Sequence, residues 1–531
     1  MVTHLRAVIG GLGILLIATP VAAPVGAAAA GASACERLST LTLPNTTITL
    51  AQTVGAGAFA PPAGRQGRGG AIYAELPSFC RVTATLAPSR DSDIKVEVWL
   101  PAFAAGSGGQ AGGWNGKFQA VGNGGWAGVI SYPALAQAVA AGYATASTDT
   151  GHSGNNGSFA LGHPEKVTDF GYRAVHEMTV QAKAVVDAYY GAAPKLSFWN
   201  GCSLGGRQGI TEAQRYPADF DAIVAGAPAV NAMYLHGARV AINQIAHRSA
   251  DSYIPPEKYS MIHDAVLNAC DALDGVKDGV IENPSRCRFD PKALACKDAD
   301  GPSCLTAAQV DTARALYAPV KDPKSGAVVF PSLLEPGSEL GWGTIAGPEP
   351  IGTALDAFKF VVFNDAGWDW HAFNPSTDIA RGVRQDAGVI DSGNTNLKPF
   401  FDRGGKLLMY HGWADQQVAA SNSVDYFTKV TKAAGRSAVG KSIELYMVPG
   451  MGHCAGGAGT DTFDKMAAIE SWVKTGRAPE SIAAAHRTNG VVDRTRPLCP
   501  FGKVARWKGA GSTDEAANFA CVADVSSAPT R

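Results

Sequence analysis

The sequence predicts an α/β fold in which a mainly parallel sheet carries helices on both faces. Strand-like and helix-like segments alternate from residue 35 to about residue 230, and the alternation resumes near residue 396. Such alternation is typical of parallel sheets. A serine flanked by glycines also stands between a strand-like and a helix-like segment, at residues 201–205. These observations predict one sheet built from two separated parts of the chain.

The length and charge of the chain restrict its class. With 531 residues it exceeds the roughly 250–300 residues at which a single core stops growing, so we expect more than one domain. It carries 45 basic and 46 acidic residues. Because there is no basic excess, no nucleic-acid partner is expected.

The first 34 residues read as a secretory signal peptide. His4 and Arg6 precede an apolar stretch at 7–17, and an Ala-Ser-Ala cleavage pattern ends at Ala34, just before Cys35. A membrane anchor is the alternative, but the apolar stretch is shorter than the ~20 residues that a span needs. We therefore expect a secreted or periplasmic protein without a membrane partner.

The first part of the core is expected at 35–229. Residues 94–100 alternate with period two, as a half-buried strand does. The other expected elements are strands at 117–121, 144–147 and 196–199 and helices at 135–141, 174–190 and 208–216.

The alternation stops at an expected inserted domain, residues 230–395. This segment is rich in proline and glycine and holds four cysteines close together. The second part of the core, 396–531, is expected to contain strands at 405–411 and 443–448 and a helix at 421–434. We place the insertion over the sheet's C-terminal edge, where open α/β sheets bind ligands.

The glycine-flanked serine is Ser203, in the pattern G-x-S-x-G of a nucleophile elbow. This sharp turn needs glycines because bulkier residues would clash, and it exposes the serine hydroxyl at the top of a sheet. The alternative is an ordinary glycine-rich turn with an idle serine. A partner base and acid would decide between them.

The base and acid follow in the order that such folds use, Ser, Asp, His. Asp415 comes after the strand expected at 405–411, and His453 after the strand at 443–448. Asp149 and His152 also follow a strand, but they precede the serine. His411 lies near Asp415 and is interpreted as a packing residue.

Stabilising the oxyanion requires two backbone N–H groups. Leu204, which follows the nucleophile, supplies the first. The second is expected from the loop 122–125, where Gly122 is the first choice and Gly124 the second. A plain flexible turn is the alternative.

The ten cysteines, an even number, predict disulfides in an oxidising compartment. Cys202 precedes Ser203 and Cys454 follows His453. If that serine and histidine are within hydrogen-bond reach, their neighbours meet the ~4.4–6.8 Å Cα separation of a disulfide. Two unrelated buried thiols are the alternative.

An acidic loop in the insertion places Asp271, Asp274 and Asp278 around two glycines. Such oxygen ligands suit calcium, and the carbonyls of Val276 and Val280 are placed to complete the shell. A solvated acidic turn is an equal alternative. Neither interpretation makes the metal catalytic.

Taken together, these residues resemble the tannase and feruloyl esterase family. The pairs Cys202-Ser203 and His453-Cys454 carry the resemblance together with Asp415, and further similar stretches lie at 148–152, 226–228, 271–280, 410–415 and 494–500. The resemblance implies an α/β-hydrolase core with a large inserted lid domain, a structural calcium ion and hydrolysis of aromatic esters.

The resemblance also implies particular pairs and ligands. The calcium ligands would be Asp271, Asp274, Val276, Asp278 and Val280. The disulfides would be Cys35–Cys80, Cys202–Cys454, Cys270–Cys287, Cys296–Cys304 and Cys499–Cys521. The family includes the hydrolase of mono(2-hydroxyethyl) terephthalate, which holds a carboxylate with a lid arginine; Arg381 and Arg384 lie in the corresponding region.

The expected function is therefore that of a secreted serine carboxylesterase of the feruloyl esterase type. Its substrate would be a small ester of a hydroxycinnamic or benzoic acid, either free or attached to plant polysaccharide, held against Trp368 or Trp370. The alternatives are a tannase, a terephthalate monoester hydrolase and, from another class, an inactive calcium-stabilised binding protein.

Overall fold

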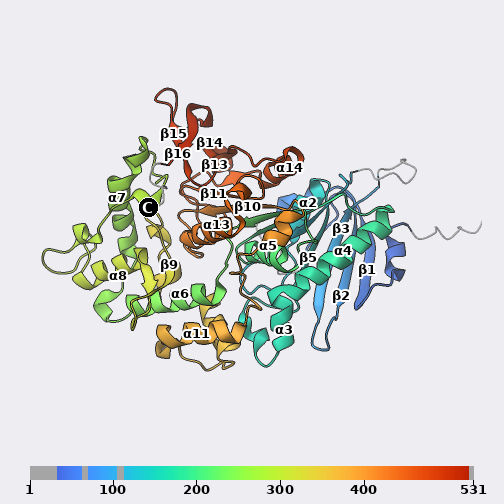
Figure 1. Cartoon of the computed structure of the whole chain (residues 1–531), viewed down its shortest axis with the longest axis horizontal. Helices are drawn as coiled ribbons and strands as arrows, with labels where there is room; N and C mark the ends of the chain where they lie inside the picture. The colour runs from blue at the N-terminus through green and yellow to red at the C-terminus, as the bar shows by residue number, and fades with distance from the viewer. Residues whose placement is uncertain (1–32, 63–69, 104–112, 525–531) are drawn as a thin grey trace, which may run out of the picture.

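A nine-stranded sheet forms the centre of the computed structural model, which describes residues 33–62, 70–103 and 113–524 (Figure 1). All but the last two residues of the expected signal peptide lie outside the described residues. The strands, in the order in which they lie side by side, are β1 (Thr46–Val54), β2 (Phe79–Leu86), β3 (Ile94–Pro101), β5 (Ala144–Thr148), β4 (Lys117–Val121), β6 (Leu196–Cys202), β7 (Ala222–Gly226), β10 (Lys406–Gly412) and β11 (Ile443–Val448).

The sheet is parallel from β5 to β11 and antiparallel from β1 to β5 through β3. Parallel strands need crossover connections, and the helices between them supply these. β6, which leads to Ser203, lies between β4 and β7. The predicted α/β fold is confirmed, while the antiparallel edge formed by β1 and β2 was not predicted.

Helices cover both faces of the sheet. Leu407 and Met409 of β10 pack in one core cluster with residues of α4, α5 and α13, while Leu408 and Tyr410 pack in another with residues of α2 and α14. Successive strand residues point to opposite faces, so β10 is buried on both sides. The α-helices of the core are α1 (Gly70–Ala74), α2 (Tyr132–Ala140), α3 (Pro164–Thr168), α4 (Ala174–Tyr190), α5 (Leu204–Arg215), α12 (Lys398–Asp402), α13 (Ala420–Ala434) and α14 (Lys465–Thr475).

Between β7 and β10 the chain leaves the sheet for the inserted segment, residues 230–395. Its apolar residues, among them the fully buried Trp342, form a hydrophobic cluster that also includes Trp126, Phe170, Leu204 and Val418 of the core. Figure 1 shows α7 and α8 at one end of the molecule, with β1 and β2 at the other. The elements of the segment are α6 (Ala232–Ala246), α7 (Tyr259–Cys270), α8 (Ala307–Tyr317), α9 (Gly343–Ala346), α10 (Gly352–Asp356), α11 (Pro375–Asp386), β8 (Pro319–Lys321) and β9 (Val328–Ser332).

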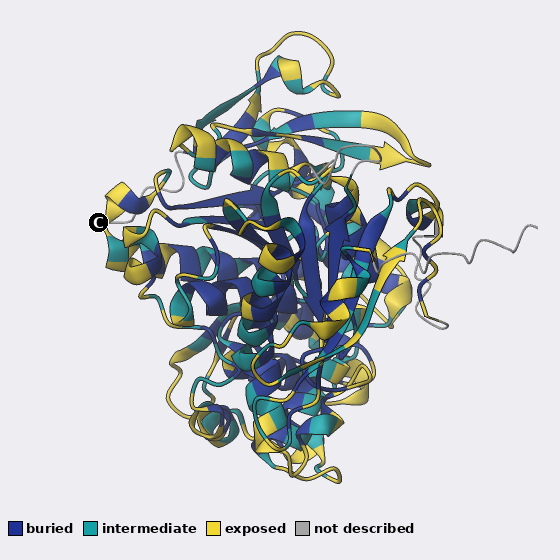
Figure 2. Ribbon diagram, turned by 90° about the vertical axis from the view of Figure 1, so that its right-hand side faces the viewer, coloured by how far each residue is buried: buried dark blue, intermediate teal, exposed yellow. Residues whose placement is uncertain are grey.

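The C-terminal part of the chain adds small antiparallel sheets that were not predicted. They consist of β12 (Thr462–Phe463), β13 (Ile482–Thr488), β14 (Val491–Leu498), β15 (Lys503–Trp507) and β16 (Phe519–Ala523). Figure 2 shows buried residues concentrated in the central sheet and the helices against it, with exposed residues at the periphery. Among the described residues, none of the helices has the length and apolar character needed to cross a membrane.

The predicted bounds of several elements agree with the structure. The strands at 117–121 and 443–448 and the helix at 174–190 have the expected ends. The helix after Ser203 differs, because it begins at Leu204 and not at residue 208. Gly205 and Gly206 are therefore helical residues, and the serine is the residue immediately before the helix.

Candidate active site

Ser203 occupies a strained turn between β6 and α5. Its backbone has φ 63° and ψ −121°, an unfavourable region for a residue with a side chain. A Cβ atom on Gly201 would lie 2.5 Å from the backbone of Gly205, and one on Gly206 would lie 2.3 Å from the carbonyl oxygen of Gly226. The glycines are therefore required by close packing, as the elbow interpretation predicts.

Asp415 lies in the loop after β10, and its side chain is fully buried. Its Oδ1 accepts hydrogen bonds from the N–H groups of Gln417 at 2.7 Å and Val418 at 2.9 Å. Burial alone would raise the pKa of this carboxyl, but hydrogen bonds from His411 and His453 outweigh burial and lower the pKa. Asp415 is therefore an anion across the physiological range.

His453 lies in the loop after β11, and its Nδ1 is 2.7 Å from Oδ2 of Asp415. Its backbone N–H donates to Oε1 of Gln416 at 3.3 Å. Because Asp415 is an anion, Nδ1 carries the hydrogen of this bond, which leaves Nε2 to act as a base. Only 11% of the imidazole is exposed.

A disulfide joins the serine turn to the histidine loop. Cys202 and Cys454 are bridged, with Cα atoms 6.1 Å apart. The other four bridges are Cys35–Cys80, Cys270–Cys287, Cys296–Cys304 and Cys499–Cys521. All five pairs match those that the family resemblance implied. The Cys202–Cys454 bridge holds Ser203 and His453 on neighbouring turns.

The expected oxyanion loop follows β4, but Gly122 does not serve as predicted. Its N–H donates to the carbonyl of Asn200 at 3.1 Å and thereby continues the β4–β6 pairing. Gly125, two residues further on, lines a cavity together with Ser203 and Leu204. The geometry therefore shifts the candidate donor from Gly122 to the Gly124–Gly125 end of the same loop.

A cavity of about 80 Å³ adjoins Ser203. Its apolar wall includes Trp126, Phe170, Ile390 and Val418, and the inserted segment contributes part of it. The indole N–H of Trp126 donates to the carbonyl of Thr353 at 3.1 Å, which fastens the core loop to that segment. A larger cavity, about 370 Å³, lies beside the loops of Asp415 and His453 but is not lined by the serine.

The two tryptophans that we expected at the substrate do not line the cavity next to Ser203. Trp368 stacks on Phe358 and Phe363, and Trp370 stacks on His371. Both contribute to the packing of the inserted segment. The aromatic residues that line this cavity are Trp126 and Phe170, which stack on each other with ring centroids 4.7 Å apart.

Two buried arginines also line the cavity. Arg239 of α6 donates to Thr353 Oγ1 at 3.3 Å and to the carbonyl of Gln417, and Arg207 of α5 donates to the carbonyl of Ile390. Burial lowers the pKa of both guanidinium groups to about 10, so they stay cationic at neutral pH. Their hydrogen bonds fasten the inserted segment to the core. Neither Arg381 nor Arg384 lines the cavity.

The alternative candidates for the acid and the base have other hydrogen-bond partners. Asp149 accepts from the N–H groups of Lys95 and Gly151, and His152 lies 2.7 Å from the carbonyl of Trp126. By contrast, His411 is more than a packing residue, because its Nε2 lies 3.0 Å from Oδ2 of Asp415. The four-residue spacing of these two residues on one strand end was the only sequence signal of this contact.

The acidic loop folds around Asp271, which is buried and accepts from the N–H groups of Asp278 and Gly279 at 3.2 and 3.0 Å. Burial, with added repulsion from Asp278 and Asp271, raises the pKa of Asp274 to about 6. Asp278 is also paired with Arg496 at 2.5 Å. Carboxylate and carbonyl oxygens are the type of ligand that calcium takes.

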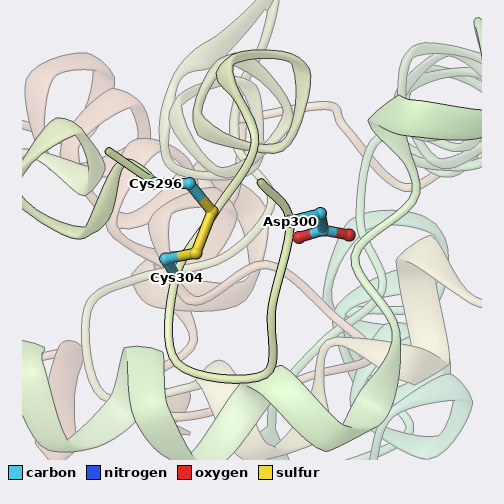
Figure 3. Close-up of side chains that lie close together, drawn as sticks. All are labelled: Cys296, Asp300 and Cys304. Carbon is cyan, nitrogen blue, oxygen red and sulfur yellow. A yellow bond between two sulfur atoms is a disulfide. The ribbon is translucent and has the colours of Figure 1, made fainter. Parts of the chain in front are cut away.

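Two clusters in the described part of the chain bring three ligand-type side chains within 4.8 Å of one another, and the acidic loop is not among them. In the first, shown in Figure 3, Cys296 and Cys304 form a disulfide and Asp300 lies on the other arm of the loop, bound to Lys258 at 2.5 Å. In the second, His176 lies 2.7 Å from Asp219, and burial raises the pKa of Glu212 well above its usual value. A disulfide leaves no thiolate ligand in the first, and in the second the His176 imidazole is already bound to Asp219 while burial disfavours the charged form of Glu212.

Comparisons with known proteins find similar proteins over most of the chain. A family model described as tannase and feruloyl esterase matches residues 80–522. An uncharacterized esterase of Xanthomonas campestris is 37% identical, over 97% of this chain and 95% of its own length. A probable feruloyl esterase B-2 of Aspergillus terreus is 34% identical, over 83% and 86%. The crystal structure of feruloyl esterase B from Aspergillus oryzae superposes with a TM-score of 0.84 at 31% identity, covering 92% of this chain and 99% of that one.

Proposed function

Because the chain belongs to the tannase and feruloyl esterase family and is a carboxylic ester hydrolase, we propose that Ser203, His453 and Asp415 hydrolyse esters of hydroxycinnamic or related benzoic acids. The observation that carries the proposal is the 2.7 Å contact between His453 and Asp415, on a loop disulfide-bonded to the turn of Ser203. An inactive binding protein has no need of this arrangement.

In the proposed reaction, Ser203 Oγ attacks the ester carbonyl while Nε2 of His453 accepts the serine proton. The alcohol leaves with that proton, and an acyl-enzyme remains. A water molecule then gives a proton to Nε2 of His453 and attacks the acyl carbon. The bond between that carbon and Ser203 Oγ breaks, the acid leaves, and His453 returns the proton to Oγ. Asp415 holds the imidazole in the required tautomer and stabilises its charged form.

Two backbone N–H groups would stabilise the oxyanion. One is that of Leu204, which opens α5 and therefore lies at the positive end of the helix dipole. The other belongs to the Gly124–Gly125 end of the loop after β4, because Gly125 and Leu204 line the same cavity as Ser203. Both donors are main-chain groups in fixed positions, as transition-state stabilisation requires.

The acid part of the substrate would occupy the cavity beside Ser203. Trp126 and Phe170 supply flat apolar surfaces suited to an aromatic ring. Relatives named as feruloyl esterases favour a hydroxycinnamic acid over a galloyl group, so the tannase alternative is not favoured. Attachment of the ester to plant polysaccharide remains part of the proposal.

Export and calcium complete the proposal. Five disulfides, and no free cysteine among the described residues, are typical of proteins from oxidising compartments and support secretion or periplasmic location. A structural calcium ion would be held by Asp271, Asp274, Asp278 and the carbonyls of Val276 and Val280. Calcium would stabilise the inserted segment and take no part in the chemistry.

The test of substrate class is a comparison of kcat/KM for methyl ferulate, methyl gallate and mono(2-hydroxyethyl) terephthalate. We expect methyl ferulate to be the best of the three. A preference for the gallate would make the enzyme a tannase, and a preference for the terephthalate would make it a monoester hydrolase. Failure to hydrolyse any of them would contradict the proposal.

A further inference from the structure

We propose that His411 is a positioning residue of the esterase, which holds Asp415 from the buried side and shares the carboxylate oxygen that binds His453. The inference rests on the proposed function, since it requires that Asp415 and His453 act on Ser203. His411 and Ser423 lie behind the acid, so that Ser423, His411, Asp415 and His453 form one hydrogen-bonded chain.

The carboxylate of Asp415 is saturated with donors. Its Oδ1 accepts from the N–H groups of Gln417 and Val418, at 2.7 and 2.9 Å. Its Oδ2 faces two imidazoles, with His453 Nδ1 at 2.7 Å and His411 Nε2 at 3.0 Å. A carboxylate has about four lone-pair sites, so each is used. The side chains of His411 and Asp415 are both fully buried.

The surroundings of His411 determine its tautomer. Its Nε2 lies 3.0 Å from both Asp415 Oδ2 and the carbonyl oxygen of Val418, and both atoms are acceptors. Nε2 therefore carries a hydrogen. Its Nδ1 lies 2.7 Å from the hydroxyl of Ser423, which is itself fully buried. A buried hydroxyl needs an acceptor for its proton, so Ser423 donates to Nδ1 and the ring is neutral.

The charged and titratable groups that face Asp415 come from several elements. They are His411 at the end of β10, His453 after β11, and the guanidinium of Arg239 on α6. Ser423 on α13 acts through His411. Of the two imidazoles, only that of His453 is partly exposed, at 11%. His411 therefore has no route to substrate and acts on the reaction through Asp415.

A second donor on Oδ2 has two consequences for His453. It fixes the carboxylate and thereby the orientation of the His453 imidazole that is bound to it. It also withdraws charge from the oxygen, which makes the carboxylate a weaker partner for the protonated imidazole. Removal of His411 should therefore slow the attack and make His453 more basic. The acid limb of the pH profile would then move to higher pH.

A matched pair of variants tests this role. In His411→Gln the amide nitrogen stands near the position of Nε2 and can still donate to Asp415. His411→Asn is one methylene shorter, so that its amide reaches toward Ser423 but not Asp415. Both replacements are polar and neutral. The measurement is the rate constant for labelling of Ser203 by a fluorophosphonate as a function of pH, which needs no knowledge of the natural substrate.

We expect His411→Gln to keep the rate within about threefold of wild type with the same pH midpoint, because the hydrogen bond is retained. His411→Asn should be slower by about tenfold or more, with its midpoint higher by about one pH unit. Equal rates and equal midpoints for the two variants would overturn the inference.

Two further outcomes have a defined meaning. If wild-type Ser203 is not labelled at all, the proposed function fails before the role of His411 is reached. If His411→Asn shows no cooperative melting transition, Ser423→Ala replaces it, because that change removes the hydrogen bond that orients the ring. The expected change then has the same direction and a smaller size, and an unchanged rate and midpoint would overturn the inference.

Discussion

Cys202 and Cys454 form a disulfide that joins the residue before Ser203 to the residue after His453, with Cα atoms 6.1 Å apart. The bridge connects positions 252 residues apart in sequence. It therefore ties the two parts of the hydrolase core together at the site itself, across the whole inserted segment.

Replacement of both cysteines by serine should lower both stability and activity. In the chain-entropy model a loop of this length corresponds to about 5 kcal/mol, and a small displacement of the histidine costs about 100-fold in kcat. The matched control is the double serine variant of Cys296 and Cys304, which are separated by 8 residues. It should lose about 2.5 kcal/mol and keep its activity. The measurements are melting temperature and kcat. If both are unchanged in the Cys202/Cys454 variant, the bridge does not hold the serine turn and the histidine loop together.

The cavity beside Ser203 should determine which acids are accepted. Ala229 lines it and is only half-buried, so a larger side chain there would narrow the cavity without filling the core. We expect Ala229→Leu to lower kcat/KM for methyl ferulate by about 10- to 100-fold. Hydrolysis of p-nitrophenyl acetate, with its small acid, should be nearly unchanged. Ala229→Ser is the control, and equal losses on both substrates would exclude the cavity as the acid site.

Calcium removal should destabilise the protein without changing the chemistry. When the free calcium concentration is a thousand times the Kd of the site, binding stabilises the fold by about 4 kcal/mol. We expect one calcium ion per chain by elemental analysis, a lower melting temperature after chelation, and loss of the ion in Asp271→Asn and Asp274→Asn. The exposed Asp298→Asn, in the same segment, should retain it. A calcium-free protein whose melting temperature is insensitive to chelator would contradict this site.

Glu444 on β11 should make stability fall as pH rises. Burial raises its pKa from 4.5 to about 7, and only part of this is offset by the N–H of Leu445. The pKa of Glu444 is higher in the folded than in the unfolded protein. Its contribution to the free energy of unfolding is therefore fully present below about pH 4.5 and is lost as pH rises through about 7. The loss is up to about 3 kcal/mol. Glu444→Gln should therefore reduce the difference in melting temperature between pH 5 and pH 8.

The exposed Glu480→Gln serves as the control for this pH dependence and should leave the difference as it is in the wild type. If Glu444→Gln shows the same difference in melting temperature between pH 5 and pH 8 as the wild type, the Glu444 carboxyl is not the source of that pH dependence.

The parts of the site that follow directly from the chain order could be predicted from sequence. Ser203, Asp415 and His453 each stand just after a strand, and parallel strands bring such positions to one edge. The pairing of Cys202 with Cys454 followed from those positions. These residues depend on local patterns and on the order of elements, both of which are visible in the sequence.

The remaining parts depend on contacts between distant segments. The hydrogen bond that occupies the Gly122 N–H arises from the register between β4 and β6, which no local pattern specifies. Trp368 packs inside the inserted segment against Phe358 and Phe363, and the positions of these partners depend on how the whole segment folds. The orientation of His411 toward Asp415 depends on Ser423 of the distant helix α13, whose hydroxyl lies 2.7 Å from His411 Nδ1.

We propose Ser203 as the nucleophile of an esterase that acts on aromatic acid esters. The most direct measurement is kcat/KM for methyl ferulate in the wild type and in Ser203→Ala, with the variant's fold checked by its melting temperature. We expect the wild type to hydrolyse the ester and the variant to lose about 10⁴-fold or more in kcat/KM. A correctly folded Ser203→Ala variant that retains the wild-type rate would contradict this proposal.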